Sequence, residues 1–307
     1  MKIKPFWITK TSIGYKKILF FLSSFIIWLI FNLVFKLPLE IFVVITLVFI
    51  NIILILVFLG LTKGITVFQK EIIEKNKEHF IVRDRFFPLH PSKSLRTICQ
   101  PKSNVSYSSI YLKNHNSWLY LDFIRKLIKK NQPQKRSALV LGGGGAVIPL
   151  ELLTSLEISS DVVEISPIMI KVAKKYFLPL RKSFLGSKIS KIKLIQADAF
   201  AYTSQNKKQY GLIIVDLFVD HLIVPKIKNS IFIKKILASS EYVIVNFGLK
   251  KSSIDHRSFF EKYIKIARYT QIYKCKGNFI GIFSNKKKIN NQLNEKNIFQ
   301  YKVDINS

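Results

Sequence analysis

The pattern of apolar residues begins with two long uncharged segments near the N-terminus. Ile18 to Phe35 contains 18 consecutive residues without a charge, and Ile41 to Leu61 contains 21. A helix rises about 1.5 Å per residue, so either segment can cross a hydrocarbon layer about 30 Å thick. Because only a short turn separates them, the pattern predicts a transmembrane helical hairpin over residues 18–61.

Lysine is unevenly distributed around this hairpin. Five lysines precede it within residues 1–17, whereas the turn holds Lys36, which Glu40 offsets. Lys63 and Lys70 follow the second segment. By the positive-inside rule both ends of the hairpin face the cytoplasm. We therefore expect a multi-pass protein of the cell membrane, with the lipid bilayer as a partner, a basic cytoplasmic N-terminus over residues 1–17 and a cytoplasmic domain after the hairpin.

The next part of the chain, residues 62–136, has a less regular pattern. Gly64 to Phe80 has the spacing of an amphipathic helix that leaves the membrane. A segment with prolines and serines follows and ends in a short β-prone stretch, and Ser117 to Lys130 again has helical spacing. We expect residues 62–136 to form a linker with a small helix and strand segment.

From Ser137 onward short apolar strands alternate with helices. The expected strands are residues 138–141, 161–165, 191–196, 210–218 and 241–247, and the expected helices are residues 147–156, 167–177, 230–237 and 254–268. Two more strands, 269–275 and 279–285, flank a turn. The alternation predicts an α/β fold over residues 137–285, which is a Rossmann-like, doubly wound and mostly parallel sheet with a C-terminal antiparallel hairpin. The tail, 286–307, is rich in lysine and asparagine and is expected to be mobile.

Composition adds a strong positive charge to this picture. Of the 307 residues, 49 are Lys or Arg and 18 are Asp or Glu, so the net charge is +31. Such a charge attracts anions, including lipid headgroups. No basic stripe is interleaved with aromatic residues, so no specific nucleic-acid partner is expected. The two cysteines, Cys99 and Cys275, are far apart and the five histidines are scattered, so we assign no metal site.

Four glycines follow the first strand of the α/β region, where ligands bind in such folds. Their bare backbone can turn sharply and approach a ligand closely. Glu164 ends the second strand, where a carboxylate can bind ribose hydroxyls, and Asp198 follows the third, where it can accept from an adenine amino group or cap a helix. Val147 stands where dinucleotide-binding loops need Gly or Ala, which disfavours a pyrophosphate cofactor.

Several successive motifs resemble those of the spermidine synthase-like transferases. They are "LVLGGGGAVIPLEL", "VVEISPIMIKVAKKYF", "IQADAFAY", "YGLIIVDLF" and "EYVIVNF", and the resemblance covers about residues 105–284. The family includes polyamine aminopropyltransferases and related S-adenosylmethionine-dependent methyltransferases. The resemblance therefore implies S-adenosylmethionine or its decarboxylated form as cofactor, and it leaves a homodimer open.

The same resemblance implies roles for individual residues. Glu164 would hold the ribose of the cofactor, Asp198 and the adjacent Ala199 would lie at the adenine, and Asp216 would be the catalytic acid with Asp220 or Tyr202 assisting. The glycines that would wrap the methionine part are Gly142, Gly143, Gly144 and Gly145.

Asp216 has a simpler alternative. Acids at strand ends often only cap the next loop, and this alternative stays open here. His221 could serve as a base, although it is more typical of an exposed loop histidine.

Three departures from the family pattern bear on the reaction. Aminopropyltransferases carry an aspartate where this chain has Gly145, and their acids are spaced D-x-x-D-P rather than the D-x-x-x-D of Asp216 and Asp220. No clear counterpart of the family's N-terminal β-domain is evident. We therefore expect a membrane-anchored transferase that moves a methyl or related alkyl group to a small-molecule acceptor. A true aminopropyltransferase and a non-catalytic membrane scaffold that retains the nucleotide-binding fold are the alternatives.

Overall fold

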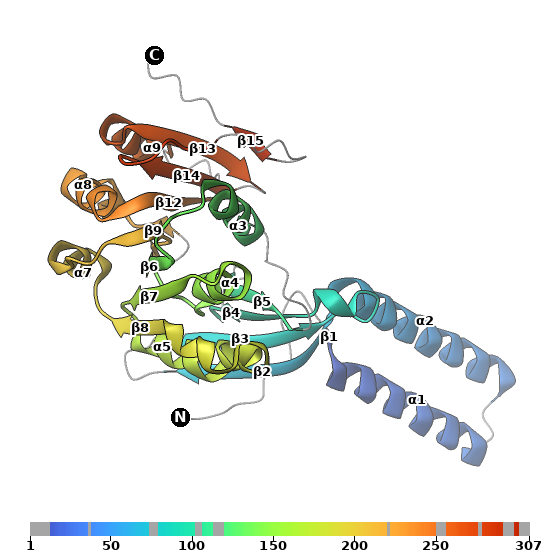
Figure 1. Cartoon of the computed structure of the whole chain (residues 1–307). Coiled ribbons are helices and arrows are strands. Elements are labelled where there is room, and N and C mark those ends of the chain that lie inside the picture. The colour runs from blue at the N-terminus through green and yellow to red at the C-terminus, as the bar shows by residue number, and fades with distance from the viewer. Residues whose placement is uncertain are drawn as a thin grey trace. The chain divides into compact units, whose positions relative to one another are not determined.

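The computed structural model divides the chain into two compact units, Met1–His115 and Asn116–Ser307 (Figure 1). It describes residues 13–35, 38–73, 79–101, 106–112, 120–219, 222–249, 256–275, 278–290 and 298–300. Each unit has its own sheet, and the two units are considered separately below.

Two helices open the first unit, α1 (Tyr15–Phe35) and α2 (Leu39–Lys63). They pack against each other, with the rings of Phe25 and Phe49 5.8 Å apart. Both predicted helices are therefore present. Among the described residues, only the stretch Leu39–Phe58 has the length and apolarity to cross a membrane, with a mean hydropathy of 3.3, whereas the apolar stretch of α1, Phe20–Phe31, is shorter.

A five-stranded sheet follows the two helices in the first unit. Its strands lie in the order β1-β2-β3-β4-β5, with β1 parallel to β2 and the rest antiparallel. Their bounds are β1 (Ile13–Gly14), β2 (Ile65–Ile73), β3 (His79–Phe86), β4 (Leu95–Cys99) and β5 (Ser106–Tyr111), and a short 3-10 turn, η1 (Pro91–Lys93), precedes β4.

This sheet corrects two expectations from the sequence. The predicted amphipathic helix over Gly64 to Phe80 is wrong, because β2 and β3 occupy that stretch as antiparallel partners. β2 is rich in β-branched residues, which favour a pleated strand, and β3 buries Val82 against Ile98 of β4. The stretch judged to lack a β-domain therefore contains an antiparallel sheet.

The second unit is built on one mixed sheet, whose described strands lie in the order β15-β13-β14-β12-β9-β6-β7-β8. The parallel strands are β6 (Ser137–Leu141), β7 (Ser159–Glu164), β8 (Ile192–Gln196), β9 (Tyr210–Val215) and β12 (Ser240–Leu249). The antiparallel strands are β13 (Tyr269–Cys275), β14 (Asn278–Ser284) and β15 (Ile298–Gln300). This arrangement confirms the predicted mostly parallel sheet with antiparallel strands at its C-terminal side.

Helices cover both faces of this sheet (Figure 1). On one face, Leu139 and Leu141 of β6 point into an apolar core with helices α8 and α9, and the intervening Val140 is buried on the other face. Contacts link α3 with α4, α7 with α8, and α8 with α9. The helices are α3 (Tyr120–Asn131), α4 (Val147–Leu156), α5 (Pro167–Val172), α6 (Pro179–Leu185), α7 (Ala199–Gln205), α8 (Ser230–Ala238) and α9 (His256–Ile266).

Shorter elements complete the second unit. A π-helical turn, η2 (Ala173–Phe177), joins α5 to α6. The turn is π-helical because the amide of Leu178 donates to the carbonyl of Ala173, five residues back, and Pro179 has no amide hydrogen of its own. The others are 3-10 turns η3 (Gly186–Lys191) and η4 (Pro225–Lys228), and a two-stranded ribbon of β10 (Phe218–Val219) and β11 (Leu222–Ile223).

The segment expected as a mobile tail from residue 286 carries ordered structure. The amide of Asn290 donates to Oδ1 of Asn131 at 2.9 Å, Lys286 Nζ donates to the carbonyl of Ala238 at 2.7 Å, and Ile289 is buried. Further along, β15 pairs with β13 and extends the sheet. The fold of the second unit therefore reaches beyond the predicted boundary at residue 285.

Candidate functional site

The glycine loop connects β6 to α4 at the carboxyl end of the sheet. Gly142 has φ of 94° and Gly144 has φ of 46°, a left-handed region that suits glycine. A Cβ at Gly142 would lie 2.2 Å from the carbonyl oxygen of Asp216. The loop therefore depends on glycine at residue 142 both for its backbone angle and for its close packing on the end of β9.

Glu164 lies at the end of β7 and holds this loop. Its Oε2 accepts from the amides of Gly143 at 3.0 Å and Gly144 at 2.9 Å, and its Oε1 accepts from the amide of Ser166 at 2.9 Å. A carboxylate that accepts several backbone bonds fixes both itself and its donors. The structure thus brings together two parts of the site that the sequence placed only at neighbouring strand ends.

Asp216 follows β9 and completes the same edge of the sheet. Its amide donates to the carbonyl of Leu141 at 2.8 Å, which ties it to the strand that carries the glycine loop. Its Oδ1 accepts from Asn246 Nδ2 at 2.8 Å, and its Oδ2 accepts from the hydroxyl of Tyr120 at 3.5 Å. Asp216 is therefore held from two sides, by β12 through Asn246 and by α3 through Tyr120.

Burial governs the protonation of this group. It raises the pKa of Asp216 to about 6, against the hydrogen bonds from Asn246 and Tyr120, which lower it, and the nearby charge of Glu164 raises it further. Burial also raises the pKa of Tyr120, and the charge of Asp216 raises it too, so the phenol stays a donor. The result is a carboxyl group that changes its charge close to neutral pH.

Tyr120 and Asn246 are site residues that sequence reasoning missed. Asn246 is 4% exposed within the apolar strand β12, and its own Oδ1 accepts from the amide of Gly248 at 3.0 Å, so its Nδ2 faces Asp216. A buried amide in an otherwise apolar strand was the available signal for Asn246. Tyr120 is the first residue of α3 and offers no comparable signal.

Asp198 and Ala199 open helix α7, which follows β8. Oδ1 of Asp198 accepts from the amides of Phe200 at 3.0 Å and Ala201 at 2.8 Å, so Asp198 is a helix N-cap, as the alternative interpretation held. Its side chain is exposed, and Ala199 packs into the apolar core. Their contact with an adenine stays a prediction.

Two predicted assisting residues do not join Asp216 here. Tyr202 hydrogen-bonds Tyr210, the first residue of β9, whereas Asp216 follows the last one. A strand of this length spans roughly 20 Å, so a catalytic role for Tyr202 beside Asp216 is wrong. Asp220 and His221 lie outside the described residues.

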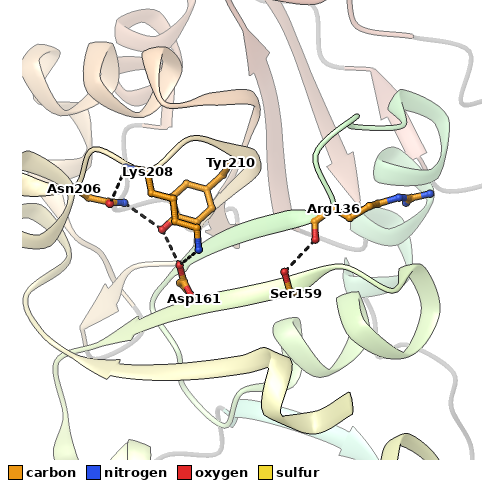
Figure 2. Close-up of polar contacts among 6 residues, drawn as sticks. All are labelled: Arg136, Ser159, Asp161, Asn206, Lys208 and Tyr210. Atoms are coloured by element: carbon orange, nitrogen blue, oxygen red, sulfur yellow. Dashed lines mark hydrogen bonds and ion pairs between the residues drawn. The ribbon is translucent and has the colours of Figure 1, made fainter. Parts of the chain in front are cut away.

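A second polar cluster lies toward the opposite, amino end of the strands (Figure 2). Asp161 Oδ2 accepts from the hydroxyl of Tyr210 at 2.9 Å and from Lys208 Nζ at 2.6 Å, and Asn206 Nδ2 donates to the same hydroxyl at 3.2 Å. Because β6 lies between β7 and β9, this cluster ties two non-adjacent strands together. Its groups are all paired with each other, so it holds the amino edge together while the loops of the site occupy the carboxyl edge.

A metal centre is not evident in the part of the chain that the structure describes. No three histidine, cysteine, aspartate or glutamate side chains within it gather closely enough to hold an ion. The polar groups at the carboxyl edge are those of the glycine loop, the carboxylates of Glu164 and Asp216, and the side chains of Tyr120 and Asn246.

Comparisons with known proteins agree on this architecture. Residues 118–249 match a family model described as the spermine/spermidine synthase domain. Among solved structures, spermidine synthase from Thermotoga maritima is 13% identical, with 73% of this chain and 74% of that chain covered and a TM-score of 0.52. A probable spermidine synthase from Corynebacterium glutamicum is 14% identical, with 72% and 80% covered and a TM-score of 0.52.

A third solved structure is a spermidine synthase in complex with the transition state analogue AdoDATO. It is 13% identical, with 73% of each chain covered and a TM-score of 0.51. A search of curated proteins gives no significant match. The fold is similar to that of these solved spermidine synthases. Within it, residues 118–249 are similar to the spermine/spermidine synthase domain.

Proposed function

We propose that this protein is a membrane-anchored S-adenosylmethionine-dependent transferase of the spermidine synthase-like type. It would transfer a methyl or related alkyl group to a nucleophilic small-molecule acceptor. The observation that carries the proposal is the setting of Asp216, a partly buried carboxyl group with a pKa of about 6 that lies at a strand end against the glycine loop.

The residues at this edge suit the chemistry of a sulfonium donor. When bound, the cofactor supplies an electrophilic carbon attached to a positively charged sulfur. Glu164 and the glycine loop would position its nucleoside, and the carboxylates of Glu164 and Asp216 would favour its positive charge. Asp216 would accept the proton that an attacking amine or hydroxyl must lose, since it is ionised at neutral pH.

Tyr120 and Asn246 would keep the base in one orientation. Their two hydrogen bonds occupy one oxygen each, and a carboxylate oxygen has a second lone pair free to receive a proton. Alignment of this kind contributes much of the rate enhancement in transfer reactions, because the acceptor and the base no longer need to find each other.

Parallel titrations of the full chain in detergent micelles test the cofactor assignment. Isothermal calorimetry would compare S-adenosylmethionine, its decarboxylated form and NAD. We expect heat from an adenosyl sulfonium and none from NAD at the same concentration. A protein that bound only NAD, or none of the three, would not be the transferase proposed.

The alkyl group can be decided by product analysis. Gly145 brings no carboxylate to the loop, in contrast to the aspartate of aminopropyltransferases, so spermidine is not expected from putrescine and decarboxylated S-adenosylmethionine. Mass spectrometry of that reaction would detect it. Formation of spermidine that disappears in Asp216→Asn would establish the aminopropyltransferase alternative instead.

Membrane anchoring is the second part of the proposal. It is supported by the exposed apolar stretch Leu39–Phe58 and by lysines on both sides of the helical pair. The full chain is expected to stay in the membrane fraction after carbonate extraction. A variant that lacks residues 18–61 should be released, and recovery of the full chain in the soluble fraction would contradict the anchor.

A further inference from the structure

A polar residue, Asn51, stands at the midpoint of the apolar helix α2. Twelve residues separate it from either end of the helix, at Leu39 and at Lys63. The nearest charged residues of the helix are Glu40 and Lys63, so each lies about 16–18 Å away along the axis. If α2 spans a bilayer, Asn51 therefore lies near the centre of the hydrocarbon core.

The side chain of Asn51 faces away from α1. Successive residues of a helix are rotated by about 100°, so Asn51 and Phe49 lie on nearly opposite sides of α2. Phe49 packs against Phe25 of α1 with 5.8 Å between the rings, whereas Asn51 is exposed. Helix α1 therefore does not cover this amide.

The amide of Asn51 is only partly hydrogen-bonded. Its Nδ2 donates to the carbonyl of Leu47, one turn earlier in the same helix, at 2.8 Å, and no group among the described residues donates to its Oδ1. A primary amide carries two N–H donors and an acceptor oxygen, so one donor and the acceptor remain. Hydrocarbon satisfies neither of them, and a polar group without a partner there is costly.

The neighbours of Asn51 form an apolar stripe with the spacing of a helix–helix contact. Val44, Asn51 and Phe58 are seven residues apart, and the side chains between them on the same face are Leu47, Val48, Leu54 and Ile55. All six apolar side chains of the stripe are 53–64% exposed. A seven-residue repeat is typical of left-handed helix pairs, in which a single central asparagine fixes the register.

We propose that the face of α2 around Asn51 pairs with the same face of a second copy of this chain, and that the two Asn51 amides hydrogen-bond each other. This inference rests on the membrane anchoring proposed above. Lipid tails cover apolar side chains as well as another helix does, so the apolar stripe alone selects no partner. A second copy brings a donor and an acceptor to the same depth, and two-fold symmetry lets each amide donate to the other.

Resonance energy transfer between copies of the full chain tests the pair. Donor-labelled and acceptor-labelled copies are mixed in phosphatidylcholine vesicles, and the lipid content is varied to measure association. Asn51→Leu removes the amide and keeps the apolar bulk, so association should weaken roughly three- to twentyfold. Thr46→Val is the matched control, because it removes a polar group from the same helix, three residues before Phe49 on the side toward α1.

The two variants should differ clearly. Energy transfer should fall in Asn51→Leu and stay unchanged in Thr46→Val. Unchanged transfer in Asn51→Leu, or an equal loss in both variants, would overturn the proposal.

Cysteine cross-linking tests which face of α2 forms the contact. Ile55→Cys places a thiol one turn from Asn51 on the same face, whereas Ile53→Cys places it one turn from Phe49 on the side toward α1. Oxidation with copper phenanthroline in the membrane should link Ile55→Cys copies into dimers and leave Ile53→Cys monomeric. The unaltered chain, whose two cysteines are buried, gives the background. Equal cross-linking of the two variants, or none in either, would overturn the proposal.

The anchor and the pair can fail separately. Release of the full chain by carbonate extraction would contradict the anchoring in the proposed function, and with it the pairing in the bilayer. Retention in the membrane, with equal energy transfer for Asn51→Leu and the unaltered chain, would overturn the pairing alone.

Discussion

At the scale of single residues, the chemistry of the site depends on how Asp216 is surrounded. Burial alone would favour the neutral acid, and the hydrogen bonds from Asn246 and Tyr120 draw the pKa back down toward about 6. Asn246 and Tyr120 come from different elements, so substituting either one should change the ionisation of Asp216 without removing the carboxylate itself.

The first prediction concerns the pH dependence of transfer. Because Asp216 must be ionised to accept a proton, the rate should rise through about pH 6 and level off above it. Asn246→Leu removes a hydrogen bond that lowers the pKa, so its midpoint should move to higher pH. The measurement is a pH–rate profile of cofactor consumption. An unshifted midpoint in a folded Asn246→Leu protein would mean that another group controls the acid limb.

The second prediction concerns stability. The folded-state pKa of Asp216 is raised from 3.8 to about 6, so its ionisation opposes folding above pH 6, and stability is regained as pH falls from about 6 toward 3.8. Asp216→Asn should therefore be more stable than the unaltered protein at pH 8, by at most roughly 3 kcal/mol. Partial exposure of Asp216 makes the actual gain smaller.

Thermal unfolding of the two proteins at pH 8 and pH 4 measures this difference. The difference in stability between Asp216→Asn and the unaltered protein should be present at pH 8 and nearly absent at pH 4. A stability difference of the same size at both pH values would show that changed packing, and not the charge of Asp216, is responsible.

At the scale of elements, the site is formed by residues at the ends of successive strands. The sequence predicts those elements whose structure depends on neighbouring residues in the chain. The strands and helices from residue 137 onward follow their own periodicity, so the sequence alone places the glycine loop, Glu164 and Asp216 at strand ends. Asn246 and Tyr120 lie 30 and 96 positions from Asp216, and only the sheet order brings them to it. β2 and β3 were missed for the same reason, since their pairing with β4 decides between strand and helix.

The third prediction tests the contact between the glycine loop and the end of β9. Gly142→Ala would place a methyl group 2.2 Å from the carbonyl of Asp216 at a positive φ, so it should cost more than about 2 kcal/mol and abolish cofactor binding. Gly186→Ala is the control, since Gly186 also has a positive φ but nothing lies within 4 Å of the added atom. It should cost roughly 1–3 kcal/mol through backbone strain, because its ψ of −132° lies outside the left-handed helical region, and it should leave binding intact. Loss of cofactor binding in both variants would argue against the close contact.

The fourth prediction concerns the cluster at the amino edge. Asp161→Asn removes the charge that accepts from Tyr210 and Lys208, so the free energy of unfolding should fall by roughly 1–3 kcal/mol. Chemical denaturation at neutral pH measures it, and Glu157→Gln, which breaks an exposed pair, should leave stability unchanged. Since the cluster lies away from the site, cofactor affinity should not change in Asp161→Asn.

At the scale of the whole molecule, a strongly basic chain joins an apolar helical pair and an antiparallel sheet to an α/β unit that carries the candidate site. The positive charge favours a negatively charged lipid surface, and the apolar stretch Leu39–Phe58 has the length and apolarity to cross the hydrocarbon core. If the chain is anchored as we propose, the bilayer would concentrate amphiphilic acceptors near it.

The short strand β15 affects how readily one copy of this chain can pair with another. It covers part of β13, from Tyr273 to Cys275, which would otherwise present unpaired backbone groups at the margin of the sheet. Open margins recruit strands from neighbouring copies. β15 is itself the outermost strand, but it is only three residues long, and very short edge strands are poor templates for pairing. A chain shortened after Asn290 is therefore expected to self-associate more readily than the full chain, which sedimentation velocity would measure.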